Sequence, residues 1–174
     1  MMAFQMNVVS SRAEAQAAQK IAVLDLVAIQ HRSLAGKSIT EQLTVYRKAF
    51  QKDADAQHKR LKAAQSELRL QRSLLSPEAI QARERKFKDE VAAVQRRFQA
   101  RKKALNKSRV EALKVFEENL TEVLKKLRAD RKIDVIIKKR PSVIYVDASV
   151  NITGEVLKRI NVRLKKIAVK NPGK

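Results

Sequence analysis

The chain has 174 residues, with 39 Lys and Arg against 18 Asp and Glu, which gives a formal net charge of +21. It holds three Gly and three Pro, too few for the turns that a β-sandwich, a barrel or a doubly wound enzyme requires. Because 44% of the residues are hydrophobic and none is Cys, the composition argues against disorder and excludes a disulfide framework and a thiolate metal site. Long helices are the fold class that remains.

Residues 1–19 are expected to be a leader or a signal remnant. Ala13-Glu14-Ala15 and Ala15-Gln16-Ala17 have the small-x-small form of a signal-peptide cleavage site. The weakly apolar stretch before them is interrupted, and no Lys or Arg precedes it. A truncated signal peptide and a flexible leader therefore stay open as alternatives. No apolar run in the chain reaches the ~18 residues of a membrane span.

The apolar run 20–26 is expected to form a short buried strand. Residues 31–38 then imitate a phosphate-binding G-x-x-x-x-G-K-S loop, but His31 replaces the first glycine, which the loop needs for its sharp turn. We therefore expect no nucleotide site. In the simpler interpretation Gly36 ends a short helix, and Ser38 with Glu41 forms a capping box for the next one.

Two long helices are expected next, because the chain between Gly36 and Pro141 contains no Gly and only one Pro. The first should run from about residue 39 to 73. The second should run from about 77 to 130, with Ser76 as N-cap and Pro77 in the first position. At 1.5 Å per residue their lengths are about 50 and 80 Å. The short connection between them predicts an antiparallel hairpin, which we place at residues 38–131.

Apolar residues at three- and four-residue spacing predict that the two helices form a coiled pair. In the second helix the spacing is carried by Phe87, Val91, Val94 and Phe98. The seam has polar interruptions at Asp53, Gln57, Arg101 and Ser108. A thin, interrupted seam predicts a flexible arm rather than a rigid rod.

The chain after the hairpin is rich in β-branched residues. Strands are expected at 133–138 and 142–147, followed by a helix capped by Thr153. Together with the first run they predict a small β-rich body, residues 20–37 and 132–167, with a flexible tail at 168–174. Because open sheet edges are normally covered or paired, we expect oligomerisation through this body.

The residues that could carry catalysis or bind a metal are not arranged for either. His31 and His58 are far apart and stand in no metal-binding spacing, and no Ser-His-Asp pattern is present. Adjacent carboxylates such as Glu117 and Glu118 are more simply explained as partners of neighbouring lysines. We therefore expect a protein that is not an enzyme and has no metal and no cofactor.

Positive charge is concentrated in the distal part of the hairpin. Residues 59–103 contain 14 Lys and Arg but only five acids, and this uncompensated charge favours an acidic partner. Aromatic residues that could stack on bases are scarce there. Only nonspecific nucleic-acid binding at low salt is therefore expected.

The two ends of the chain carry a family resemblance. It rests on residues 20–29 and 33–37, and most specifically on 133–138, 143–147 and 152–161. Over about residues 20–166 the sequence resembles the Skp (OmpH-like) family of periplasmic outer-membrane-protein chaperones, although Asn151 stands where the family usually has Asp. The resemblance implies a homotrimer in the periplasm, in which a trimeric β-barrel body carries three helical-hairpin arms around a cavity.

The expected fold is thus α+β but mainly α, and the expected function is that of an ATP-independent holdase whose basic arms bind unfolded outer-membrane proteins. The expected client-binding residues are Leu70, Leu74, Leu75, Arg83, Arg85, Lys86, Lys88, Arg96, Arg97, Arg101, Lys102 and Lys103. Lipopolysaccharide or an anionic membrane surface is a further candidate partner. The alternative function is that of a basic coiled-coil protein that binds nucleic acid or anionic membranes.

Overall fold

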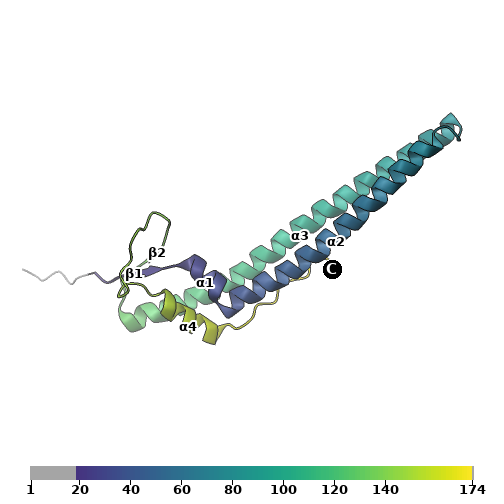
Figure 1. The fold of residues 1–174 in the computed structure, drawn as a ribbon. Helices are drawn as coiled ribbons and strands as arrows, with labels where there is room; N and C mark the ends of the chain where they lie inside the picture. The colour runs from purple at the N-terminus through teal and green to yellow at the C-terminus, as the bar shows by residue number, and fades with distance from the viewer. Residues whose placement is uncertain (1–18, 174) are drawn as a thin grey trace, which may run out of the picture.

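The computed structural model describes residues 19–173, which form a long helical hairpin attached to a small body (Figure 1). The leader expected at 1–19 lies, apart from its last residue, outside the described residues. The elements are, in chain order, β1 (Ile21–Leu24), α1 (Leu26–Arg32), α2 (Leu34–Gln71), α3 (Pro77–Arg131), β2 (Val135–Lys138) and α4 (Thr153–Arg163). The expected fold class, mainly helical with a small β component, is confirmed.

The hairpin consists of α2, with 38 residues, and α3, with 55. As predicted, Ser76 caps α3, because its hydroxyl oxygen accepts a hydrogen bond from the backbone N–H of Ala79 at 3.3 Å, and Pro77 occupies the first helical position. Helix α3 ends at Arg131, and its C-cap residue Lys132 has a left-handed φ of 52°. Local capping chemistry therefore fixes both ends of the longest element.

The start of α2 differs from the expected one. The helix begins at Leu34, and its N-cap is Ser33, whose hydroxyl oxygen accepts from the N–H of Gly36 at 3.1 Å. The predicted capping box at Ser38 is wrong, and Gly36 does not end a helix but lies in the first turn of α2. A Cβ on Gly36 would stand 1.7 Å from the carbonyl oxygen of Gln30, so the absence of a side chain lets α2 begin directly against α1.

The body contains a two-stranded parallel sheet in which Ile21 of β1 is paired with Val135 of β2. The other edge of β1 is occupied by a single bridge between Val23 and Asn151. The strand expected at 142–147 does not form among the described residues, so the sheet contains no β-hairpin there. The outer edge of β2 therefore stays unpaired among the described residues.

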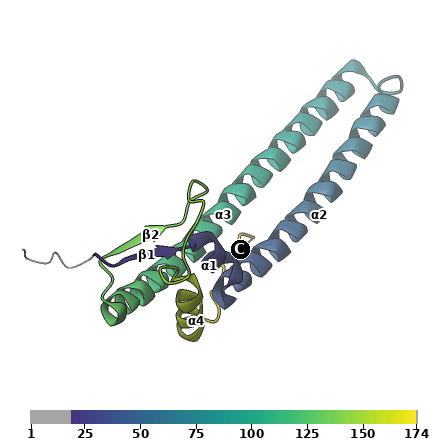
Figure 2. The same ribbon diagram turned by 60° about the vertical axis from the view of Figure 1, so that its left-hand side comes forward.

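One apolar core unites the body with the root of the arm. Helix α3 contributes the fully buried Phe116 and Leu127, which share a cluster with Ile29 of α1 and Ile160 of α4. On α2 the last buried residue is Leu43. The core therefore ends a short way along the hairpin, and most of the arm extends beyond it (Figure 2).

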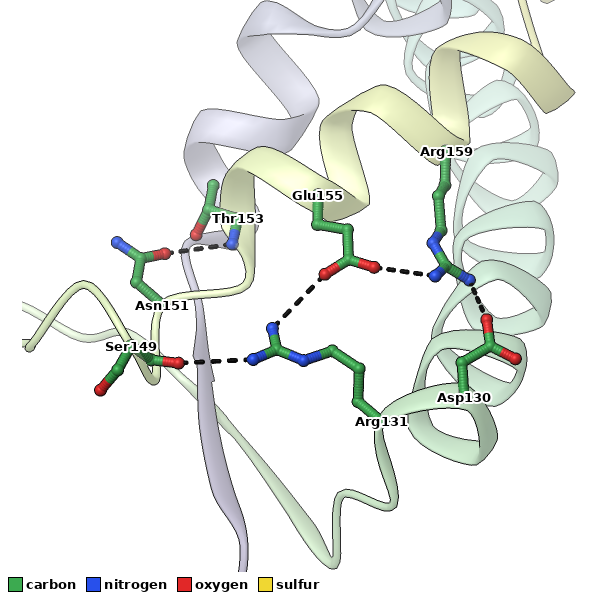
Figure 3. Close-up of polar contacts among 7 residues, drawn as sticks. All are labelled: Asp130, Arg131, Ser149, Asn151, Thr153, Glu155 and Arg159. Carbon is green, nitrogen blue, oxygen red and sulfur yellow. Dashed lines mark hydrogen bonds and ion pairs between the residues drawn. The ribbon is translucent and has the colours of Figure 1, made fainter.

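Hydrogen bonds and ion pairs between polar side chains connect the start of α4 to the end of α3 (Figure 3). Glu155 accepts hydrogen bonds from Arg131 at 3.4 Å and from Arg159 at 2.8 Å, and Arg159 also pairs with Asp130. Thr153 is the first residue of α4 rather than its expected cap. Its hydroxyl oxygen instead accepts from the backbone N–H of Asp25 at 3.0 Å, which joins α4 to the start of α1.

The last described residues, 165–173, form what we call the C-terminal strap. They leave α4 and run back along the base of the hairpin (Figure 1). A flexible tail was expected from residue 168, but the side chains of Ile167 and Val169 are buried. Their apolar contacts with the hairpin explain why this segment lies against it.

Candidate binding surface of the arm

The two helices of the distal arm meet along a thin seam. Phe50 of α2 and Phe98 of α3 are in edge-to-face contact, with ring centroids 5.4 Å apart. Farther out, Phe87, Val91 and Val94 are only half-buried. Among the described residues no side chain between Leu43 and Ser108 is buried, so this part of the hairpin has a contact line but no core.

Ion pairs between the helices supplement this seam. Asp53 accepts from Arg101 at 2.6 Å and lies 3.4 Å from Arg97. Nearer the tip, Glu84 pairs with Arg72 at 2.6 Å, and this hydrogen bond lowers the pKa of the Glu84 carboxyl. The polar interruptions that the sequence shows at positions 53 and 101 are thus two halves of one ion pair. Their opposite charges, at roughly mirrored distances from the tip of an antiparallel hairpin, were a signal that could have revealed it.

The structure separates the expected client-binding cations into two groups. Arg97 and Arg101 are engaged with Asp53, and Arg97 also stacks over the ring of Phe98, 5.4 Å from its centroid. Arg83 donates to the side-chain oxygen of Gln71. The others are exposed and have no ion-pair partner within residues 19–173, namely Arg85, Lys86, Lys88, Arg96, Lys102 and Lys103.

The expected apolar contacts lie at the tip of the arm. Leu70 is 70% exposed and Leu74 is 79% exposed, whereas Leu75 is half-buried. Just below the tip, an open groove of about 660 Å³ lies between α2 and α3, and Leu68, Phe87 and charged side chains line it. The tip region therefore combines exposed leucines with an open groove that is lined mainly by polar and charged side chains.

The described part of the chain gives no sign of metal or membrane-spanning chemistry. Within residues 19–173 no three His, Asp or Glu side chains are close enough together to hold a metal ion. No helix in this range is both long enough and apolar enough to cross a bilayer.

These features define a class of protein in which a small α+β body carries a long, basic helical hairpin. A family model described as outer membrane protein (OmpH-like) matches residues 20–160, and the chain belongs to this family. A crystal structure from Caulobacter crescentus CB15, of a "putative outer membrane chaperone (OmpH-like)", has the same fold, with a TM-score of 0.78. The two sequences are 17% identical, and the match covers 98% of this chain and 96% of that one. No curated protein matches the chain.

Proposed function

We propose that this protein is an ATP-independent holdase chaperone of the periplasm, which binds unfolded outer-membrane proteins between its basic arms and prevents their aggregation. Membership of the OmpH-like family supports this proposal, as does the fold shared with a protein described as an outer membrane chaperone. The observation that carries it is the distal arm itself, where exposed cations and the exposed leucines of the tip lie on two helices that have no buried side chain between Leu43 and Ser108.

The proposed mechanism follows from the charge and exposure of the arm. Unpaired cations attract an acidic unfolded chain and accelerate its capture, and this attraction weakens as salt screens it. Leu70 and Leu74 then offer small apolar contacts that an extended client can exchange rapidly. Several arms that act on one client add such weak contacts into a higher avidity, without the consumption of a nucleotide.

The proposal includes a homotrimer joined through the body. Outside the arm the chain leaves β-branched and aromatic side chains exposed, among them Val135, Ile137, Ile144 at 99% and Tyr145 at 78%. Segment 142–147 has the composition of a strand but no strand partner among residues 19–173. Pairing of this segment with the sheet of a neighbouring copy would cover both features, because an open edge accepts an added strand. Native mass spectrometry tests the assembly, and a monomer at micromolar concentration would contradict it.

The first functional test is dilution of a urea-unfolded acidic outer-membrane β-barrel protein into buffer without nucleotide, followed by light scattering. The full chain should suppress aggregation, and the suppression should weaken as salt rises. Added nucleotide should change nothing. If aggregation proceeds unaltered at every salt concentration, the holdase proposal fails.

Neutralising the free arm cations tests the electrostatic part. A quadruple Gln variant at Arg85, Lys86, Lys88 and Arg96 should slow client association about tenfold at low salt. Arg97 and Arg101 are left in place because their loss would also break pairs within the arm. The matched control neutralises four exposed cations nearer the body: Arg109, Lys114, Lys126 and Lys158. An equal effect of both variants would show that only net charge matters.

Polar substitution of the tip leucines tests the apolar part. Leu70→Ser with Leu74→Ser should shorten the client's residence time about tenfold and leave the salt dependence unchanged, because two exposed apolar contacts are removed. Val45 and Val110, 62% and 54% exposed on the root of the arm, provide the control pair when they are changed to Ser. If the control pair has the larger effect, the tip is not the contact site.

Nucleic acid and anionic vesicles serve as competitors in the same assay, since the alternative function predicts that either displaces the client at physiological salt. Displacement by DNA under those conditions would favour the alternative. Fractionation of the native protein, followed by identification of the proteins that co-purify with it, tests the periplasmic location. Lipopolysaccharide binding stays a prediction.

A further inference from the structure

Side chains of α2 hold the C-terminal strap by hydrogen bonds to its backbone N–H and carbonyl groups. The side-chain amide of Gln42 donates to the carbonyl oxygen of Ile167 at 2.7 Å, and its oxygen accepts from the N–H of Val169 at 3.0 Å. One turn farther along, the Tyr46 hydroxyl donates to the carbonyl oxygen of Val169 at 3.2 Å. Three polar contacts from one face of α2 therefore fix the strap beside two buried side chains, those of Ile167 and Val169.

The strap also contacts α3. The ammonium group of Lys170 pairs with the Glu111 carboxylate at 2.9 Å. Beyond it, residues 171–173 form one wall of a small cavity of about 220 Å³, whose other walls include Tyr46 and Phe50 of α2 and Leu105 of α3. The strap thus touches both helices and bridges them at the root of the arm.

The place of this bridge along the hairpin is informative. Leu43 on α2 and Ser108 on α3 are the outermost buried residues of the hairpin among those described. The contacts of the strap extend from this level outward to Phe50 and Leu105. It therefore covers the stretch in which the core has ended and the thin seam begins.

We propose that the C-terminal strap is a splint for the root of the arm. While the strap is bound to both helices, α2 and α3 cannot separate below Phe50 without breaking either its hydrogen bonds to Gln42 and Tyr46 of α2 or its pair with Glu111 of α3. Bending and opening of the arm are therefore confined to the region beyond it. The strap lies outside the range that the family model matches, residues 20–160, and its role does not depend on the identity of any client.

Hydrogen exchange of the full-length protein, followed by mass spectrometry, tests the splint. Gln42→Met keeps the side-chain volume but removes the hydrogen bonds to both strap residues, so residues 43–50 and 101–108 should exchange at least tenfold faster. Exchange in α4 and in residues 112–127 should stay unchanged. Gln51→Met is the matched control, because Gln51 is exposed on the same helix and bonds only to Asp55.

A second variant, in which the chain ends at Leu164, removes the strap altogether and should produce the same local acceleration or a larger one. Gln42→Glu places a carboxylate oxygen against the carbonyl oxygens of Ile167 and Ser38, so it should accelerate exchange at least as much as Gln42→Met. Unchanged exchange at the root in Gln42→Met overturns the proposal. Acceleration that is equal throughout the body also overturns it, because the strap would then be an ordinary part of the core. Neither readout involves a client, so failure here leaves the holdase proposal standing.

Discussion

Helix α3 passes through two physical environments. In its body half Phe116 is fully buried, whereas in its arm half Phe98 is half-buried against one ring of α2. The backbone hydrogen bonds of the helix are the same in both halves, so the difference lies in what its side chains contact. The comparison shows that a continuous helix can be stabilised by a core at one end and by little more than a contact line at the other.

This division suits the proposed function. The regions that open or bind in proteins are commonly those with few buried contacts and low local stability. Here the body half has the buried core, and the arm half offers accessible cations and leucines on a pair of helices with few buried contacts. A stronger core in the arm would reduce both the exposed surface and the freedom to adapt to an unfolded chain.

The largest test of the comparison truncates the same residue type in both halves. Phe116→Ala should lower the free energy of unfolding by about 4 kcal/mol, because it leaves a cavity in the core. Phe98→Ala should cost about 1 kcal/mol, because the ring is only half-buried and the arm can relax around its loss. Urea denaturation at one fixed protein concentration measures both. Equal losses would contradict the proposed division of the helix.

The two helical glycines give a second contrast, within the body. Gly36→Ala should destabilise the protein by about 3 kcal/mol, because the new methyl group would collide with the backbone of α1, which cannot move aside freely. At Gly154, in the first turn of α4, a Cβ would meet nothing within 4 Å. Gly154→Ala should therefore stabilise the helix by about 0.5 kcal/mol. Thermal unfolding measures both changes in stability. If the two substitutions change the stability in the same direction, the close approach of α1 and α2 is contradicted.

The sequence predicted those elements whose cause is local. The serine and proline at positions 76 and 77 marked the start of α3 because an N-cap and a first-turn proline act within a few residues. The start of α2 was missed because the sequence offered two serines, and the choice of Ser33 over Ser38 depends on the packing of α1 against Gly36. The segment 142–147 was assigned to a strand on composition, but a strand also needs a partner that composition cannot supply.

Only part of the candidate site could be predicted from the sequence. The basic charge and the exposed leucines of the tip follow from position along the hairpin alone. The pairing of Arg97 and Arg101 with Asp53 depends on the register between two helices, which the turn at the tip fixes. The strap was missed because its short, basic sequence shows no periodicity, and its only conspicuous residues are Ile167 and Val169.

A smaller effect is expected from the ion pairs of the arm. Asp53→Ala leaves Arg97 and Arg101 without their partner. In urea denaturation it should lower the free energy of unfolding by about 0.5 kcal/mol at low salt, because ion pairs this exposed are weak. At 1 M salt the difference should vanish through screening. Asp55→Ala, on the exposed side of the same turn, is the control and should leave the free energy of unfolding unchanged at either salt concentration. A cost that persists at high salt would point to packing instead of charge.

The smallest effect concerns the pH dependence of the strap. The hydrogen bond from Lys170 lowers the pKa of the Glu111 carboxyl below its ordinary value of 4.5. A carboxyl whose pKa is lowered by folding stabilises the folded state above that ordinary value, and it loses this contribution as the pH falls through the lowered one. Lys170→Met should therefore raise the titration midpoint of Glu111, measured by carboxyl ¹³C NMR, whereas Lys166→Met should leave it unchanged.

Because Glu111 lies at the surface, a change of pH should alter the attachment of the strap and leave the core intact. If the titration midpoint of Glu111 is the same in Lys170→Met as in the wild type, the Lys170–Glu111 pair does not help to hold the strap. The strap would then be attached through Gln42 and Tyr46 alone.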